Sequence, residues 1–222
     1  MSLIFATLTV VAAAAVLGYA LQIQRVKVEG VQLFDPQPVR EALEEVVGKS
    51  PLWASAQALR EKVLAIPWVD DAQVAMELDG TVVCHVRERQ PAAVLADATP
   101  PQFVDSFGRI LGPAENAQEH VHLFGFASYF EERQKVLRLL YELSALWGKP
   151  VQMCQRLAAR DLGITFAGEP WVVVVDPSHP EVLPMGKKLL AAWEKRSLPT
   201  PTRLDLRLPG RIFVQTQQEV SQ

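Results

Sequence analysis

The sequence predicts an α+β protein: an N-terminal transmembrane helix, a β-α-α-β-β domain, and then a mixed, mainly antiparallel β-domain with two helices. Three observations lead to this prediction. Residues 3–21 contain no Asp, Glu, Lys or Arg. Helical apolar spacing then gives way to two-residue alternation before position 91. Beyond that point, short apolar segments bounded by Gly and Pro accompany two longer helical stripes.

The apolar run at the N-terminus is long enough to cross a bilayer as one helix. Leu3 to Leu21 is 19 residues, which at 1.5 Å per residue spans roughly 28 Å. We therefore expect residues 1–21 to form a membrane anchor. Gly18-Tyr19-Ala20 resembles a cleavage site, so a removed signal peptide is the alternative, although no basic residue precedes the run.

Charges beside the run bear on its orientation. Arg25 and Lys27 follow it and no Lys or Arg precedes it, which taken alone would keep the body in the cytoplasm. A basic tail upstream of residue 1 would reverse that orientation. We favour the missing tail because of the features of the body described below.

Composition narrows the class of protein. Of the 222 residues, 49% are hydrophobic and 21% charged, as expected for a folded body with one membrane span. A net charge of −3 and a pI near 5.8 argue against a nucleic-acid surface. The two cysteines, Cys84 and Cys154, lie far apart in sequence, and a buried thiol explains Cys84 better than a disulfide does.

The first domain opens with a short strand, Val26 to Val31, and continues with two helices. Each helix presents an apolar stripe at helical spacing, and Gly48 and Pro67 end the first and the second helix. The stripes are Val39, Ala42, Leu43, Val46 and Val47 in the first helix, and Leu52, Ala56, Leu59, Val63 and Ile66 in the second.

A hairpin follows, with its turn at Asp79-Gly80. Apolar residues alternate at Ala72, Val74, Met76 and Leu78 on one strand and at Val82, Cys84 and Val86 on the other. A two-residue loop would place the two apolar sets on opposite faces. We therefore predict a three-residue loop that pairs Met76 with Val82 or Cys84 and puts Gly80 in the left-handed region. His85 and Arg87 would then point to the wetter face.

Pro91 marks the boundary to a second domain, and the last residues, 217–222, look like a disordered tail. Glu131 to Trp147 and Gly186 to Lys195 are predicted helices, the first with Val136, Leu139, Leu140, Leu143 and Trp147 inward. Predicted strands are Ala93–Leu95, Phe103–Asp105, Ile110-Leu111, Arg156–Asp161, Ile164–Ala167, Trp171–Val175, Leu204–Arg207 and Ile212–Gln215.

The sequence offers little catalytic chemistry. His120 and His122 lack further ligands at metal-binding spacing, and no nucleophile elbow or Gly-rich phosphate loop is present. Asp70 and Asp71 are neighbours on a predicted strand, so we expect them on opposite faces. Trp68 is interpreted as a core anchor between helix and hairpin.

Motifs in this order resemble those of the FtsQ/DivIB cell-division proteins, over most of the chain. An apolar span leads into Val26-x-Val28-Glu29-Gly30-Val31, followed by Pro67-Trp68-Val69, Val82-x-Cys84-x-Val86-x-Glu88-Arg89-x-Pro91, Val104-Asp105-x-x-Gly108 and Leu204-Asp205-Leu206-Arg207. Asp79-Gly80 replaces a Pro-containing loop usual in the family. Met76 stands at an often basic position, and Leu208 replaces an aromatic residue found in some members.

The resemblance implies a bitopic inner-membrane protein with its body outside the cytoplasm, at the division septum. Its parts would be the anchor (1–21), a POTRA-like domain (22–91), an FtsQ-type β-domain (92–216) and the tail (217–222). It implies no catalytic activity, no cofactor, no metal, no small-molecule substrate and no nucleic acid. The implied role is a divisome scaffold that binds small single-span coiled-coil proteins of the FtsL and FtsB/DivIC types.

In the family, a C-terminal edge strand receives a strand of the FtsB-type partner. Here Arg211 to Gln215 is the expected last strand, lightly charged and open to pairing. Arg207 matches the family arginine implicated in partner contact; an exposed, unpaired arginine is the alternative, and for the strand an edge covered by the tail. The expected partner-binding residues are Arg207, Leu208, Arg211, Ile212, Phe213, Val214 and Gln215, and the POTRA structural motif is Gly30, Pro67, Trp68 and Val69.

Two other functions stay open. One is a POTRA-type module that binds unfolded polypeptide during assembly or transport, although such units usually occur in tandem before a β-barrel. The other is a secreted enzyme with an unrecognised site, which would need a pocket with convergent polar groups.

Overall fold

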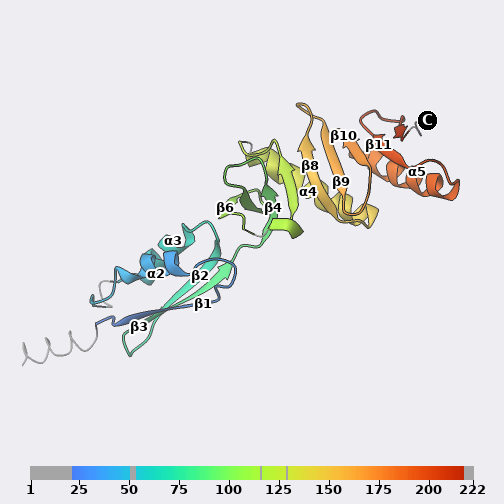
Figure 1. The fold of residues 1–222 in the computed structure, drawn as a ribbon. Helices are drawn as coiled ribbons and strands as arrows, with labels where there is room; N and C mark the ends of the chain where they lie inside the picture. Colours follow the sequence, from blue (N-terminus) through green and yellow to red (C-terminus); the bar gives the residue numbers. More distant parts are fainter. Residues whose placement is uncertain (1–21, 51–53, 116, 129, 218–222) are drawn as a thin grey trace, which may run out of the picture. The chain divides into compact units, whose positions relative to one another are not determined.

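The computed structural model describes residues 22–50, 54–115, 117–128 and 130–217 (Figure 1). The expected anchor, residues 1–21, lies outside the described residues, as do Leu52 and residues 218–222 of the expected tail. Within the described ranges no helix is both long and apolar enough to cross a membrane. The chain divides into two compact units, unit 1 ending at Arg89 and unit 2 beginning at Gln90.

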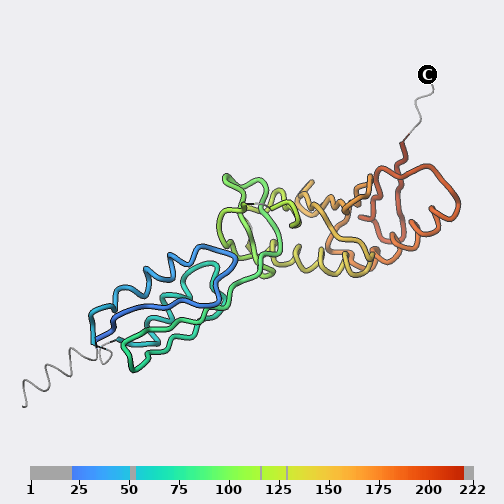
Figure 2. Tube along the Cα trace, turned by 60° about the horizontal axis from the view of Figure 1, so that its bottom comes forward, coloured from blue at the N-terminus to red at the C-terminus, as the bar shows by residue number. Residues whose placement is uncertain are grey.

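Unit 1 has the element order β-α-α-β-β that its apolar pattern predicts (Figure 1). The elements are β1 (Arg25–Glu29), α2 (Gln37–Glu44), α3 (Ala56–Leu64), β2 (Val69–Met76) and β3 (Thr81–Glu88). The strands lie in the order β1-β3-β2, with β1 parallel and β2 antiparallel to β3. In Figure 2 the blue trace of β1 runs beside the green trace of β3, although more than fifty residues separate Arg25 from its partner Thr81.

The hairpin of unit 1 confirms the predicted register. Met76 pairs with Val82, and the Glu77 N–H donates to the Thr81 carbonyl at 2.8 Å, so three residues close the loop. Gly80 has a φ of +80°, in the left-handed region as expected. A Cβ there would also lie 2.5 Å from the Gln22 carbonyl oxygen. Both the backbone angle and the lack of space therefore require glycine in this turn.

Both helices of unit 1 pack on one face of its sheet, where the alternating residues of β3 meet them. The residues of this core are almost fully buried: Val39 and Leu43 of α2, Leu59 and Val63 of α3, and Val82, Cys84 and Val86 of β3. The first helix ends three residues earlier than its stripe predicts. Residues 45–48 form turns instead of a further helical turn, and the Gly48 N–H donates to the Ile23 carbonyl at 2.8 Å.

Unit 2 is a nine-stranded mixed sheet with two main helices (Figure 1). Its strands are β4 (Pro91–Leu95), β5 (Gln102–Asp105), β6 (Ile110–Pro113), β7 (Val121–Phe124), β8 (Val151–Arg156), β9 (Leu162–Phe166), β10 (Val172–Val175), β11 (Pro201–Asp205) and β12 (Phe213–Thr216). The helices are α4 (Phe130–Trp147) and α5 (Leu183–Lys195), with single turns η1 (Ala117–Glu119) and η2 (Pro180–Val182).

The strand order of unit 2 is β12-β11-β10-β9-β8-β7-β4-β5-β6. The pairs β4–β7, β7–β8 and β10–β11 are parallel and the other five antiparallel, so the sheet is mixed and mainly antiparallel. All five predicted inward residues of α4 are buried in its core. This order leaves β12 at one end of the sheet.

The largest differences from the sequence prediction in unit 2 concern β8 and β7, and β11 begins at Pro201 rather than at the predicted Leu204. The strand predicted at Arg156–Asp161 is wrong: β8 ends at Arg156, and residues 157–161 form a turn closed by the Leu157 N–H on the Asp161 carbonyl at 2.8 Å. In β8 a register shift near Met153 separates the buried Val151 and Cys154 by three positions. That shift hides the two-residue alternation by which strands are recognised. Strand β7 was not predicted.

Candidate partner-binding site

Strand β12 is the last element of the described chain and the terminal strand of the unit 2 sheet. Within residues 90–217 as described, it pairs with β11 alone, antiparallel, with Asp205 opposite Phe213 and Leu204 opposite Val214. A register shift near Thr202 separates these pairs from Pro201–Thr216. The other side of β12 is therefore a sheet edge.

One side-chain contact shows which backbone groups face that edge. The Thr202 hydroxyl on β11 donates to the Gln215 carbonyl at 3.2 Å, so the backbone polar groups of Gln215 point toward β11. Successive residues of a strand alternate in direction. The N–H and C=O groups of Val214 and Thr216 consequently point to the open edge.

The side chains of β12 divide between the two faces of the sheet. Val214 is half-buried opposite the fully buried Leu204, on the helix-covered face, and Ile212 packs against the same core. Phe213 lies on the other face beside Asp205 and is 53% exposed, as is Leu208 in the preceding loop. The strand thus combines an anchored inner face with an exposed aromatic on its outer face.

Two of the expected strand residues lie before the strand. The predicted strand began at Arg211, whereas β12 begins at Phe213. Gly210 takes a φ of +77°, and the Arg211 N–H donates to the Leu208 carbonyl at 3.1 Å, so Arg211 closes a turn that precedes the strand. Arg211 is exposed and Ile212 is half-buried, and both belong to the loop rather than to the edge.

The guanidinium of Arg207 is already paired within unit 2. Its Nε lies 2.9 and 3.1 Å from the two carboxylate oxygens of Asp205, Nη2 lies 2.6 Å from Asp205 Oδ2, and Nη1 lies 2.6 Å from Asp161 Oδ2. These bonds lower the pKa of Asp205 and raise that of Arg207. The alternative of an unpaired arginine is wrong, and a role of Arg207 in partner contact stays a prediction.

Sequence reasoning missed both carboxylates. Asp205 stands two positions before Arg207, on the same face of a strand, and that spacing was a usable signal. Asp161 is 46 positions away in a turn between β8 and β9, where no local pattern indicates it.

The POTRA structural motif of unit 1 lies at element ends. Gly30 follows β1 with a φ of +87°, and a Cβ there would lie 2.2 Å from the Val86 carbonyl oxygen, so only glycine fits. Pro67 is exposed between α3 and β2, and Val69 is fully buried at the start of β2. Trp68 is half-buried and stacks on Phe34, with ring centroids 5.9 Å apart. It is not the core anchor expected, because Val69 holds the core position.

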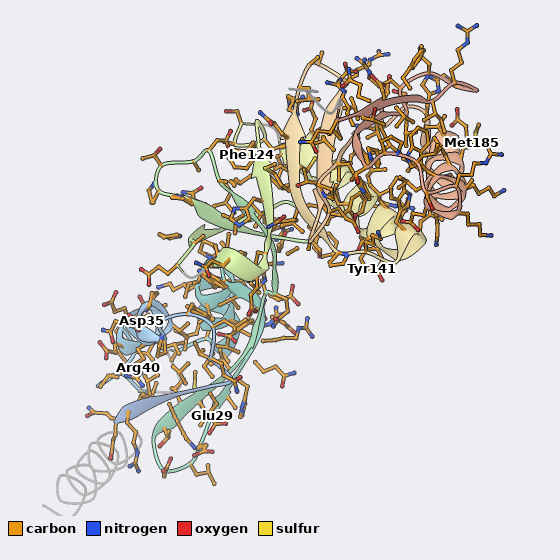
Figure 3. All side chains as sticks on the ribbon, turned by 45° about the vertical axis from the view of Figure 1, so that its right-hand side comes forward. Glu29, Asp35, Arg40, Phe124, Tyr141 and Met185 are labelled. Atoms are coloured by element: carbon orange, nitrogen blue, oxygen red, sulfur yellow. The ribbon has the colours of Figure 1, made fainter. Side chains whose placement is uncertain are left out.

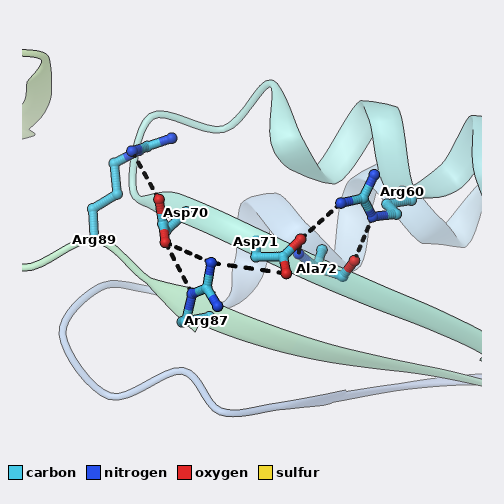
Figure 4. A network of polar contacts seen from close by, with 6 residues as sticks. All are labelled: Arg60, Asp70, Asp71, Ala72, Arg87 and Arg89. Carbon is cyan, nitrogen blue, oxygen red and sulfur yellow. Dashed lines mark hydrogen bonds and ion pairs between the residues drawn. The ribbon is translucent and has the colours of Figure 1, made fainter.

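The Asp70-Asp71 pair of unit 1 also departs from expectation (Figure 4). A register shift in β2 beside Asp70 breaks the alternation, and Arg87 contacts both carboxylates, Asp70 at 2.9 Å and Asp71 at 3.8 Å. The expected opposite faces are therefore wrong, because a bulge brings the two side chains to one arginine. Arg89 also binds Asp70, at 3.0 Å.

Arg60 of α3 reaches the backbone of β2 in the same network (Figure 4). Its Nε donates to the Ala72 carbonyl at 2.7 Å and its Nη2 to Asp71 Oδ1 at 2.8 Å, while the Ala72 N–H donates to that same oxygen at 2.9 Å. These bonds lower the pKa of Asp71. Both backbone groups of Ala72 are satisfied by side chains at this point of β2.

The other chemistry considered is arranged differently. Among the described residues, no group of three His, Cys, Asp or Glu side chains is placed to hold a metal ion. Cys84 and Cys154 are free and buried, and burial raises the pKa of the thiols to about 11 and about 12. A cavity of about 570 Å³ in unit 2 has a mainly apolar lining that includes Leu137, Tyr141 and Val151. Tyr141 of α4, labelled in Figure 3, is 78% exposed.

Comparison with known proteins bears on unit 1 most directly. The family model "POTRA domain, FtsQ-type" matches residues 21–89. A cell division protein FtsQ from Thioalkalivibrio sp. (strain K90mix) is 35% identical over 78 residues, which is 34% of this chain and 31% of that protein. Unit 1 is thus an FtsQ-type POTRA domain. In this chain the POTRA domain is followed by the sheet of unit 2, which ends at β12. The matched segment spans about a third of the length of the curated FtsQ relative.

Proposed function

We propose that this chain is a divisome scaffold that binds FtsB/DivIC-type and FtsL-type membrane proteins by strand addition to β12. Residues 1–21 anchor it in the cell membrane at the division septum, with the body outside the cytoplasm. Residues 22–91 form the POTRA-like domain, 92–216 the β-domain and 217–222 a tail. In this proposal the chain performs no catalysis.

The observation that carries the proposal is the position of β12. Its outward N–H and C=O groups, at Val214 and Thr216, lie at a sheet edge that an incoming strand could satisfy. Because Ile212 packs against the core and Val214 is half-buried opposite the buried Leu204, the edge is ordered before a partner arrives. An ordered edge lowers the entropy cost of pairing.

Exposed apolar side chains beside the edge support the same function. Phe213 and Leu208, each 53% exposed, flank the β11–β12 connection, where aromatic and aliphatic side chains commonly contribute to binding. The curated relative is named as a cell division protein, and this agrees with the proposed role.

Affinity capture of the full chain from detergent-solubilised native membranes tests the proposal. We expect the wild-type chain to recover single-span coiled-coil proteins of the FtsB and FtsL types, and removal of residues 213–222 to abolish their recovery. Val214→Pro removes an outward N–H and should reduce recovery strongly, whereas Val214→Ala keeps that N–H and should retain most of it.

Phe213→Asp tests the outer face separately and should also abolish recovery. Circular dichroism and the protease resistance of both units establish that each variant is folded. Undiminished recovery with folded Phe213→Asp and Val214→Pro would overturn strand addition at β12. Recovery of unfolded polypeptides by unit 1, or of no protein at all, would overturn the scaffold in favour of a polypeptide-binding module or an enzyme.

A further inference from the structure

Arg207 connects two distant parts of the unit 2 sheet. It lies two residues beyond the end of β11, and its partner Asp161 directly precedes β9. Strand β10 lies between β9 and β11 in the sheet. The ion pair at 2.6 Å therefore reaches across one whole strand, and Asp205 holds the same guanidinium from the end of β11.

The three nitrogens of the Arg207 guanidinium all bind these two carboxylates. These contacts use at least three of the five N–H groups of the guanidinium and hold it in one orientation. The carboxylates of Asp205, at the end of β11, and of Asp161, in the turn before β9, are only 15% and 24% exposed, so both are partly shielded from solvent. The guanidinium of Arg207 is therefore held in place by carboxylates of its own unit and acts as a fixed support for the chain around it.

What the support fixes is the start of the loop that leads into β12. The Leu206 N–H donates to the Val174 carbonyl at 2.8 Å, and Arg207 follows. Residues 208–211 are then exposed until Ile212 returns to the core. A slip of one residue in this loop would exchange the faces of Phe213 and Val214 and reverse which amides face the open edge.

We propose that Asp161 is a positioning residue for partner binding, acting through Arg207 to hold β12 in register. This inference rests on the proposed function where it concerns the partner. The positioning itself is a property of the chain alone. Asp161 touches no partner in this account, so its substitution acts by disturbing the edge.

Amide hydrogen exchange of the full chain in detergent tests the positioning without any partner. We expect Asp161→Asn to speed exchange of the Phe213 and Gln215 amides, which face β11, by about tenfold relative to wild type. Asp161→Glu keeps the carboxylate and should restore most of the protection. Glu181→Gln, an exposed carboxylate elsewhere in unit 2, makes the same change in charge and should leave β12 unchanged.

Capture of the FtsB-type protein with the same variants completes the test. Recovery should fall with Asp161→Asn and return with Asp161→Glu. Higher recovery with unchanged exchange would overturn the inference, because Asp161 would then be competing with a partner for Arg207. Faster exchange in Asp161→Asn, with no partner captured even by wild type, would support the positioning and count against the proposed function alone.

Discussion

Strands β2 and β12 are both sheet edges, but side chains bind outward-facing backbone groups on β2 and an inward-facing carbonyl on β12. On β2, Arg60 and Asp71 bind the C=O and N–H of Ala72 (Figure 4). On β12, Thr202 binds the inward carbonyl of Gln215 and leaves Val214 and Thr216 directed outward. Near β12, the charged side chains of Arg207 and Asp205 bind each other rather than backbone groups of the edge strand.

The difference shows how the placement of an arginine decides what an edge can do. Arg60 projects from a helix over the edge of β2 and caps a carbonyl that another strand would need. Arg207 stands at the exit of β11, where it orders the edge strand without covering it. Arg60 binds an outward carbonyl of its edge, whereas in the function proposed above Arg207 orders an edge that stays open to a partner strand.

The largest expected effect is the difference between proline substitution at an inward-facing amide of β12 and at an outward-facing one. Gln215→Pro removes an N–H that faces β11, so we expect β12 to detach, with loss of amide protection at Phe213 and complete loss of partner recovery. Val214→Pro should lose partner recovery while β12 keeps its pairing with β11. Equal loss of protection in both variants would show that the assigned alternation is wrong.

A smaller effect is expected when the protection of β2 is removed. Arg60→Met keeps much of the side-chain volume but leaves the carbonyl of the buried Ala72 without its donor, at a cost of about 1–3 kcal/mol in the free energy of unfolding. The exposed β2 edge should also cause self-association that increases with protein concentration. Urea unfolding and sedimentation velocity measure the two consequences.

Arg40→Met is the matched control for that variant, because Arg40 is an exposed arginine of α2 in the same unit. It should change neither stability nor association beyond a few tenths of a kcal/mol. A monomeric Arg60→Met protein with reduced stability would mean that Arg60 stabilises unit 1 without protecting its edge.

Features that depend on local patterns could be predicted from the sequence. Alternation at Val82, Cys84 and Val86, with glycine at position 80, predicted both the loop length and the register of the hairpin in unit 1. The helical stripe of α4 likewise predicted every inward residue that was named. Such features follow from the period of the backbone and the conformations open to glycine.

Features that depend on irregular pairing or distant residues were not predictable. The bulge at Asp70 and the register shift in β8 both break the two-residue period. The edge position of β12 was expected from the family, but its first residue and the contacts of Arg207 were not. Asp161 reaches Arg207 only because the sheet places β9 and β11 on either side of β10.

The smallest expected effect is a difference in acid sensitivity between the two edges. Hydrogen bonds from arginine lower the pKa of Asp205, on β11 opposite Phe213 of β12, and of Asp71 on β2 below the ordinary value of 3.8. A carboxyl whose pKa is depressed by folding adds stability above its unfolded pKa, and that stability is lost as the pH falls through the folded value. Both networks should therefore hold at about pH 5 and weaken at about pH 3 and below.

Asp205 is 15% exposed and Asp71 31%, so the pairing at β12 is less screened by solvent and should lose more on acidification. Hydrogen exchange, corrected for its intrinsic pH dependence, should show a larger loss of protection at Phe213 than at Gln73 between those two pH values. Asp205→Asn should abolish the change at β12 by giving low protection at both. A larger loss at β2 would mean that Arg60 is the more important of the two arginines for the order of its edge, and would reverse the roles assigned to them.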